Sequence, residues 1–305
     1  MCTVLTMAYH STAIPSRPAL LTHLRDSRIA GRVATPRENN LLHYQLMADR
    51  DPHYLLGLDP SRSWTSESVL EVMAARVGVS PDPRYREGID TIDPELTVAA
   101  LDRYAARLAT AAARRETVYF ATGHPASLAQ LYQGFADALR SYGCRILRAG
   151  EGWSYEASSR YGTRRLTIGY SAAYRSGESD HDGSASPSPS STDGDVAALE
   201  DAGGPVHSHA ARPIKATLAA LAAAGEPLPD LVVADHGWCG GAAQEGVDAI
   251  GFADCNDPAL FAGEYEGVVQ VAVGLDDGLR PAVYGPLGRY VLGRLAETVR
   301  TVTES

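Results

Sequence analysis

The sequence has almost no lysine: of its 27 basic residues one, Lys215, is a lysine and the other 26 are arginines. The 37 acidic residues outnumber them, which gives a net charge of −10 at pH 7. A protein with this overall field repels phosphate polymers and anionic lipid surfaces. We therefore expect neither nucleic acid nor a membrane among its partners, although small anions can still bind at local sites.

Long apolar runs and closely spaced cysteines are also missing. No stretch approaches the roughly 18 apolar residues of a membrane span, and residues 1–17 lack the basic start and apolar segment of a secretion signal. The four cysteines form no C-x-x-C pair, which argues against a zinc ribbon or a thioredoxin-like redox site. These absences predict a cytoplasmic protein with reduced thiols.

The pattern of apolar and polar residues divides the chain into two regions. Hydrophobic residues make up 45% of it, which is enough for a sizeable core. Residues 1–115 contain helical segments joined by polar loops at 35–40 and 87–94, and we predict a helical N-terminal region packed on the core. Its clearest helix begins at Asp93-Pro94, because aspartate is a good cap and proline suits the first turn.

From residue 116 to residue 305, short apolar runs alternate with helical segments. This alternation predicts an α/β domain with a mostly parallel, doubly wound, Rossmann-like sheet. The expected strands are Thr117–Ala121, Cys144–Arg148, Arg165–Tyr170, Asp230–Ala234, Ala249–Ala253 and Val268–Val273. Residues 176–204 differ, because serine, glycine, aspartate and proline dominate them, and we predict a mobile insert there.

Three of the expected strands end in polar segments, at 122–127 (TGHPAS), 235–241 (DHGWCGG) and 254–258 (DCNDP). In an open parallel sheet, ligands bind beyond the carboxyl ends of the strands. If these three strands are neighbours, the segments line a single crevice. The crevice is our candidate functional site.

The first segment joins a strand to a helix, where free backbone N–H groups and the helix dipole favour an anion. Thr122, Gly123 and Ser127 are therefore candidate substrate-binding residues, and His124 could protonate a leaving oxygen. The alternative is an ordinary turn in which His124 caps the helix. Because the segment does not match the P-loop pattern of nucleotide-binding proteins, we expect no nucleotide cofactor.

The second and third segments combine carboxylates with an imidazole and an amide. Asp235 and His236 are candidate catalytic residues, with the carboxylate acting as a general base or a metal ligand. Asp254 and Asn256 offer oxygen ligands that suit a hard cation, Mg²⁺ or Mn²⁺. Asp257 precedes a proline and a helix, so we expect it to act as a helix cap. Turn capping and simple exposure are the alternatives for the other residues.

Two further polar groups lie outside these segments. In an extended segment His207 and His209 point the same way, which makes them candidate metal ligands. Arg37, Asn39 and Asn40 form a polar cluster, and we consider them for substrate binding because arginine suits phosphate recognition. Ordinary loop and cap positions are the alternative for both groups. The histidines that we expect to be incidental are His10, His23, His53 and His181, and His43 is expected to pack within a helix.

Six longer strings resemble, in this order, a family of bacterial proteins known simply as phosphatases and common in bacteria of high GC content. The strings are ATPRENNLLHY, GIDTIDPELTVAAL, ATGHPASL, HSHAARPIKA, LPDLVVADHGW and GFADCNDPALF. The resemblance runs from about residue 17 to residue 295, apart from the 176–204 insert. It implies hydrolysis of a phosphate monoester of a small metabolite, such as a sugar, nucleoside or cyclitol phosphate, with a place in specialised metabolism left open.

Other functions remain consistent with the same residues. The TGHPAS segment also resembles the phosphate loop of phosphosugar-binding domains, which favours an isomerase or a sugar-phosphate sensor that leaves the phosphate intact. A binding module for a protein partner is a third alternative. The oligomeric state stays open, since a sheet edge or a helical face could pair two chains.

Overall fold

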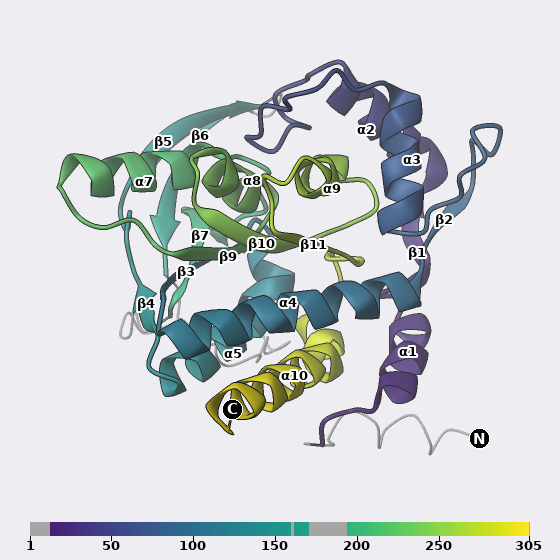
Figure 1. Cartoon of the computed structure of the whole chain (residues 1–305). Coiled ribbons are helices and arrows are strands. Elements are labelled where there is room, and N and C mark those ends of the chain that lie inside the picture. The colour runs from purple at the N-terminus through teal and green to yellow at the C-terminus, as the bar shows by residue number, and fades with distance from the viewer. Residues whose placement is uncertain (1–12, 160–161, 171–193, 305) are drawn as a thin grey trace, which may run out of the picture.

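The computed structural model describes residues 13–159, 162–170 and 194–304 (Figure 1). Within them, nine strands form one mixed sheet in the order β11-β10-β9-β3-β7-β6-β5, with β4 paired to β3 and β8 paired to β7. These strands are β3 (Thr117–Ala121), β4 (Arg145–Leu147), β5 (Ser154–Ser159), β6 (Gly162–Gly169), β7 (Val196–Asp201), β8 (Gly204–Pro205), β9 (Leu231–Asp235), β10 (Asp248–Ala253) and β11 (Val271–Gly274).

Most of the sheet is parallel, because its central strands are joined by helices that cross its faces. The pairs β11–β10, β10–β9, β9–β3, β3–β4 and β3–β7 are all parallel. One face carries α4 (Pro94–Arg114), α5 (Pro125–Ser141) and α10 (Gly285–Glu304), and the other carries α7 (Arg212–Ala223), α8 (His236–Gln244) and α9 (Pro258–Tyr265) (Figure 1). The α/β class predicted from the alternating pattern is confirmed.

The long helix α4 links the N-terminal part of the chain to the sheet. Its cap is the predicted one, since the Asp93 side chain accepts a hydrogen bond from the backbone N–H of Glu95. The buried Tyr104 ring of α4 stacks on Phe252 of β10, with ring centroids 4.9 Å apart. The helices before α4 are α1 (Arg17–Asp26), α2 (Arg37–Ala48) and α3 (Ser66–Arg76).

Two segments expected to be loops contribute to a second, small sheet. Strand β1 (Gly31–Pro36) pairs antiparallel with β2 (Ile89–Ile92), and α2 begins directly after β1. Both strands are short and lie beside polar residues, so the sequence shows no clear apolar alternation that would predict them. Residues 35–40 and 87–94 are therefore not loops throughout. Their β-sheet hydrogen bonds come from the pairing of β1 with β2, which the local sequence pattern does not predict.

Part of the predicted 176–204 insert belongs to the sheet. Residues 196–201 form β7, which is buried between β3 and β6, and residues 204–205 form β8. The apolar run from Val196 to Leu199 therefore belongs to the core, even though it follows a Ser- and Pro-rich stretch. Residues 176–193 lie outside the described residues.

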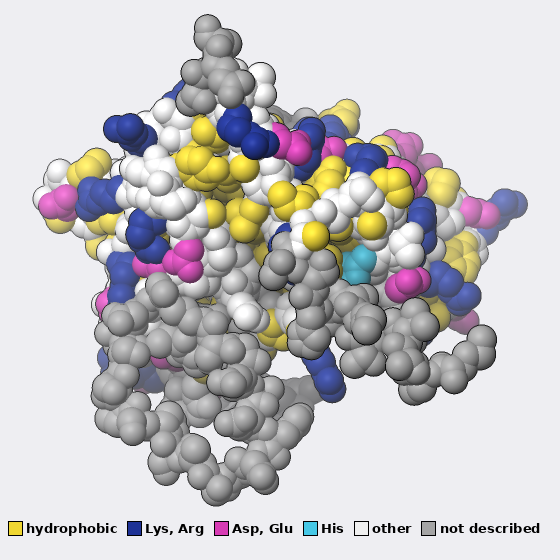
Figure 2. Space-filling model, turned by 90° about the horizontal axis from the view of Figure 1, so that it is seen from below, with side chains coloured by type: hydrophobic (Ala, Val, Ile, Leu, Met, Phe, Trp, Pro, Cys, Tyr) yellow, Lys and Arg dark blue, Asp and Glu magenta, His cyan; other side chains and the backbone are white. Residues whose placement is uncertain are grey.

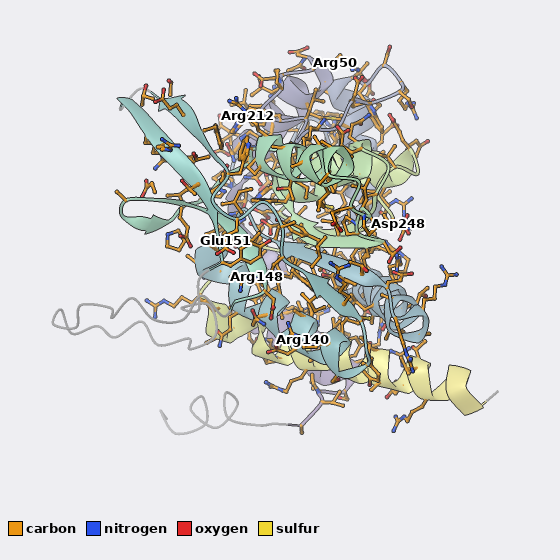
Figure 3. All side chains as sticks on the ribbon, turned by 90° about the vertical axis from the view of Figure 1, so that its left-hand side faces the viewer. Arg50, Arg140, Arg148, Glu151, Arg212 and Asp248 are labelled. Atoms are coloured by element: carbon orange, nitrogen blue, oxygen red, sulfur yellow. The ribbon has the colours of Figure 1, made fainter. Side chains whose placement is uncertain are left out.

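At the β5 end, the sheet becomes antiparallel through the pairs β5–β6, β6–β7 and β7–β8. One ion pair joins α5 to the segment that leads into β7, and another lies within the loop after β4. Arg140 of α5 contacts Asp195, just before β7, at 2.6 Å, and Arg148 pairs with Glu151 at 3.1 Å (Figure 3). The strand β5 was not predicted, because its alternation is formed by Ser, Tyr, Glu and Ala rather than by strongly apolar residues.

The surface below the sheet mixes charges of both signs with apolar side chains (Figure 2). In the part of the chain that the structure describes, no helix combines the length and the apolar character required to cross a bilayer.

Candidate active site and metal centre

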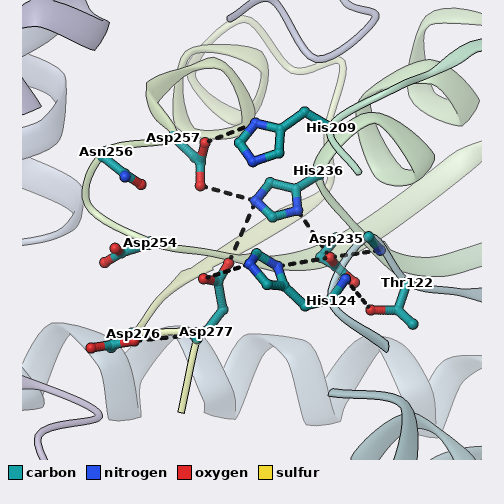
Figure 4. Close-up of polar contacts among 12 residues, drawn as sticks. Thr122, His124, His209, Asp235, His236, Asp254, Asn256, Asp257, Asp276 and Asp277 are labelled. Atoms are coloured by element: carbon teal, nitrogen blue, oxygen red, sulfur yellow. Dashed lines mark hydrogen bonds and ion pairs between the residues drawn. The ribbon is translucent and has the colours of Figure 1, made fainter. Parts of the chain in front are cut away.

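The polar segments of the central strands meet at one edge of the sheet (Figure 4). Strands β11, β10, β9 and β3 are parallel neighbours, so their carboxyl ends lie side by side. Each strand is followed by polar side chains, and those of β3, β9 and β11 contact one another through His124, Asp235, His236 and Asp277. The convergence of polar segments inferred from three strand ends is therefore present, and a fourth strand contributes to it.

Two glycines let the chain segment with His207 and His209 approach this edge closely. A Cβ atom at Gly123 would collide with the carbonyl oxygen of Ser208 and lie 2.9 Å from His236 Nδ1. A Cβ atom at Gly237 would collide with the carbonyl oxygen of His209. Glycine at both positions therefore allows the segment with His207 and His209, which precedes β9 in the chain, to cover the start of α8.

His236 begins α8 in a left-handed backbone conformation, with a φ of 46°. A non-glycine residue in this region costs of order 1–3 kcal/mol and persists where the surroundings impose it. Here the side chain is fully buried, and its two ring nitrogens face carboxylates on opposite edges of the ring. The conformation places the imidazole at the centre of the cluster.

Asp235 borders one edge of this ring. Its Oδ2 atom accepts a hydrogen bond from the backbone N–H of Gly123 at 2.9 Å and lies 3.1 Å from His236 Nδ1 and 3.5 Å from His124 Nδ1. Burial by itself raises the pKa of Asp235, but hydrogen bonding and charge from His124 and His236 outweigh it and lower the pKa. The carboxylate is therefore ionised and positions both imidazoles.

Asp277 and Asp257 border the opposite edge. The carboxylate of Asp277 lies 3.6 Å from His124 Nε2 and 3.7 Å from His236 Nε2. Asp257 lies 3.1 Å from His236 Nε2 through one oxygen and 3.8 Å from His209 Nδ1 through the other. Burial raises the pKa of Asp277 to about 6, although His124 and His236 act in the opposite direction.

The remaining imidazoles stack on this core. His207 lies on His124 and His209 lies on His236, each pair with ring centroids 4.1 Å apart, and His53 stacks on the far side of His209 at 5.0 Å. Burial and the neighbouring imidazoles lower the pKa of His207 to about 4 and lower that of His209 further. Both rings are therefore neutral near pH 7 and have nitrogen lone pairs available.

The cluster suits a metal cation. Three buried polar atoms of the cluster have no hydrogen-bond partner among the described residues: Nδ1 of His209, Oδ1 of Asp235 and Oδ2 of Asp277. The nitrogen–oxygen separations of 3.1 to 3.8 Å are close to the roughly 3.3 Å between ligands that a tetrahedral ion holds at about 2.0–2.1 Å. Two groups have ligand atoms mutually within 4.8 Å: His124, His207 and His236, and His209, His236 and Asp257.

Asp254 and Asn256, predicted as metal ligands, border the cluster without joining either metal-capable group. Asp254 accepts hydrogen bonds from the Thr35 hydroxyl and from the backbone N–H of Cys255. Burial raises its pKa well above the ordinary value, and the charge of Asp277 adds to this rise. The backbone carbonyl of Asn256 contacts His43 Nδ1 at 2.8 Å, so the His43 ring, expected to pack within a helix, reaches the β10–α9 segment.

In the helical region, the side chains predicted to contact phosphate bind other protein groups instead. Arg37 is fully buried, pairs with Asp90 at 2.9 Å, and donates its other N–H groups to the carbonyls of Tyr85 and Asp82. Asn40 donates to the same Asp90 carboxylate. These contacts fasten the β2 segment to α2 and leave the substrate-binding prediction for Arg37 and Asn40 without support. Asn39 is half-buried on the same helix.

The loop after β3 also uses its donors internally. The N–H of Gly123 donates to Asp235, and the N–H of His124 donates to the hydroxyl of Thr122, which is almost fully buried. Ser127 is buried in the first turn of α5. The predicted anion cradle of Thr122, Gly123 and Ser127 is therefore without support, and the loop instead fixes the direction of the His124 ring.

Three site residues escaped the sequence analysis. Asp257 occupies the cap position of α9, as expected, but its side chain makes no capping hydrogen bond and contacts His236 instead. Asp277 follows β11, and the strand-end argument would have found it if applied to that strand as well. His53 was considered incidental, because only the fold brings it against His209.

The fold and this cluster define an α/β protein with a buried histidine–aspartate centre at the carboxyl ends of its strands. The chain belongs to the Phosphatase family, whose model matches residues 15–299. It is 48% identical over 280 residues to Phosphatase SCO2771 of Streptomyces coelicolor (strain ATCC BAA-471 / A3(2) / M145), in a match that covers 91% of this chain and 95% of that protein. The resemblance inferred from the six strings is confirmed.

Proposed function

We propose that this protein hydrolyses phosphate monoesters of small metabolites with the help of at least one divalent cation held by the histidine–aspartate cluster. The observation that supports the proposal most directly is the convergence of four imidazoles and three carboxylates, with orphaned buried polar atoms, in a member of a phosphatase family. Sugar, nucleoside and cyclitol phosphates are the substrate classes that we favour.

A cation bound there would polarise a phosphoryl oxygen and lower the pKa of a bound water molecule. The residues that would hold it are His124, His236, Asp257 and Asp277, which face one another across 3.1 to 3.7 Å. In this proposal Asp235 is a positioning residue, because its carboxylate contacts the Nδ1 edges of both His124 and His236. The phosphate is held mainly by the cation, since the loop amides of 122–124 are occupied.

The composition of the cluster bears on the choice of metal. Imidazole nitrogens suit zinc, manganese and related transition metals, whereas Mg²⁺ prefers oxygen ligands and retains water. Of the two ions expected from the sequence, Mn²⁺ matches the cluster better than Mg²⁺, and Zn²⁺ joins it as a candidate.

The leaving alkoxide needs a proton. The contacts of the cluster favour a proton donor other than His124, which the sequence suggested for this role. His124 and His236 are flanked by carboxylates at both ring edges, which suits ligands rather than proton donors. His53 is exposed, stacks on His209, and belongs to neither metal-capable group. We assign it the role of general acid, which typically contributes 10²- to 10⁴-fold to a rate.

The test is phosphate release from a panel of small phosphate monoesters by purified full-length protein. The protein is assayed after EDTA treatment and again after addition of Mn²⁺, Zn²⁺ or Mg²⁺. We expect release that EDTA abolishes and that Mn²⁺ or Zn²⁺ restores. Conversion of a sugar phosphate to its isomer without phosphate release would favour the isomerase, and the absence of any turnover or phosphate-dependent thermal shift would favour the protein-binding module.

A further inference from the structure

We propose that a groove beside α1, β1 and β2 is a second anion-binding site, suited to a phosphate group and separate from the histidine–aspartate cluster. This inference goes beyond the proposed function and does not depend on it. The groove has a volume of about 800 Å³, and it is lined by Arg25, Arg28, Gly31, Arg32, Val33, Ala34 and Ile89. Sites for small molecules commonly have volumes of roughly 300–1,000 Å³. We call it the arginine groove.

The arginine groove concentrates positive charge in an acidic protein. None of the described residues that line it is acidic, whereas the whole chain has a net charge of −10. The guanidinium groups of Arg25, Arg28 and Arg32 form no hydrogen bond or ion pair with the residues that the structure describes. Guanidinium groups bind phosphate oxygens through paired, charge-assisted hydrogen bonds. Three of them without partners in one groove favour a multivalent anion.

Helix capping does not account for these arginines. Two of them lie at the end of α1, where a cation can stabilise the helix dipole and bind the last carbonyls. However, backbone N–H groups within residues 27–30 already donate to the carbonyls of His23, Leu24 and Arg25. Arg32 belongs to β1 rather than to the helix. The guanidinium groups therefore remain available for a ligand from outside.

The turn from α1 into β1 brings the three side chains together. Helix α1 ends at Asp26 and β1 begins at Gly31, and Arg28 lies between them in a left-handed backbone conformation with a φ of 61°. A Cβ atom at Gly31 would lie 3.6 Å from Cγ of Arg25. The aliphatic stem of Arg25 therefore lies over the start of β1, beside the residue that precedes Arg32.

Strand β1 lies between the arginine groove and the histidine–aspartate cluster. Its side chains alternate in exposure, with Arg32 exposed at the groove and Thr35 turned inward, where the hydroxyl donates to Asp254 beside the cluster. The segment before β1 also contacts the site, because the backbone N–H of Asp276 donates to the carbonyl of Ile29 at 2.8 Å. A phosphate group in the groove is therefore not the one that is hydrolysed, although both sites share β1.

Another groove with arginines provides an internal comparison. It has a volume of about 550 Å³ and contains Arg164 and Arg165, but Glu200 and Asp201 line it as well. Arg164 pairs with Asp201 at 3.2 Å. The charges of this groove are balanced within the protein, so we expect no anion there. Arg164→Gln is the matched control, because it changes the net charge by the same amount without altering the arginine groove.

The test measures phosphate binding to the full-length protein after EDTA treatment, which removes any cation from the cluster and with it the proposed catalytic phosphate contact. Inorganic phosphate and, separately, glucose 6-phosphate are titrated by isothermal calorimetry at low ionic strength, because salt screens exposed charges. We expect one bound anion per chain. Arg28→Gln and Arg32→Gln should each weaken binding roughly tenfold or more, since each removes hydrogen bonds to a charged group. Arg164→Gln should bind like the wild-type protein.

The two titrations also separate the sources of the phosphate group. Tighter binding of inorganic phosphate would identify free phosphate as the ligand, and tighter binding of glucose 6-phosphate would identify a phosphorylated metabolite; either result supports the site. The absence of saturable binding, or equal weakening in Arg164→Gln and Arg32→Gln, would overturn the inference. Thermal unfolding of each variant distinguishes a lost site from a lost fold. Because the assay contains no metal and no turnover, its failure would leave the proposed phosphatase activity unaffected.

Discussion

Asp235 and His236 are consecutive residues whose side chains face each other, with Oδ2 of the carboxylate 3.1 Å from Nδ1 of the imidazole and both side chains fully buried. Consecutive residues at the end of a strand normally point to opposite sides. The positive φ of His236 turns its ring back toward the carboxylate. A local backbone distortion thus builds the centre of the candidate site.

The Asp277→Asn substitution should remove a metal contact with little change in shape. We expect kcat/KM for phosphate release to fall by roughly 10²-fold or more, since a lost metal ligand typically costs at least as much as the 10- to 100-fold of a supporting contact. Asp276→Asn is the control, because that carboxylate accepts a hydrogen bond from the Gly278 N–H and, unlike Asp277, forms no ion pair with His124 or His236. Equal activity of the two variants would show that Asp277 is not part of the centre.

His53→Gln should slow substrates with poor leaving groups more than those with good ones. An alkyl phosphate needs a protonated leaving oxygen, whereas p-nitrophenyl phosphate does not. We expect a loss of roughly 10²-fold or more in kcat for the alkyl phosphate and little loss for p-nitrophenyl phosphate, measured at constant bound metal. The same loss on both substrates would assign His53 to another role.

Gly123→Ala should lower both stability and activity. The added Cβ would meet the Ser208 carbonyl and His236 Nδ1, which forces the His207 segment away from the site. We expect a destabilisation of about 1–3 kcal/mol in denaturant unfolding and weaker metal binding. Gly134→Ala is the control, because a Cβ there meets nothing within 4 Å in the middle of α5, and it should stabilise the protein by about 0.5–1 kcal/mol.

Arg37→Ala should destabilise the protein while leaving the KM of the remaining folded enzyme unchanged. The substitution leaves the Asp90 charge buried without its partner, a loss typically worth roughly 3–5 kcal/mol. Denaturant unfolding measures the first effect and steady-state kinetics below the unfolding temperature measure the second. A large rise in KM with unchanged stability would restore Arg37 as a substrate-binding residue.

Protonation of His207 should make the metal-free protein lose more stability than a His207→Gln variant as the pH falls from about 6.5 toward 4. Asp277, whose pKa is raised to about 6, contributes in the opposite direction in both proteins. Burial lowers the pKa of His207 in the folded state to about 4 from its ordinary value of 6.5. Between these values the unfolded chain binds a proton that the folded chain does not, so acid favours unfolding. Thermal unfolding of the two chelated proteins across this pH range measures the difference, which should grow as the pH falls. An unchanged slope in the variant would place the titration elsewhere.

Some parts of the fold could be predicted from the local sequence. The runs Thr117–Ala121, Asp230–Ala234 and Ala249–Ala253 are strongly apolar and end in polar residues, so their parallel pairing and their common edge followed from general rules. The α4 cap at Asp93 was equally clear. By contrast, β1, β2 and β5 have weak patterns, because their backbone partners rather than their side chains stabilise them.

The amino-acid sequence by itself indicated the parallel sheet, the edge at which polar residues collect, and the presence of His124, Asp235 and His236 there, because these features follow from periodicity and from residue type at strand ends. It indicated His207 and His209 through their spacing in an extended segment. Only the tertiary structure decided that Asp257 contacts an imidazole rather than a helix end, that Asp277 and His53 join the cluster, and that Arg37 serves Asp90. The physical reason is that the contact partner of a side chain belongs to a segment far away in the chain. The local sequence pattern does not predict which distant segment will pack against it.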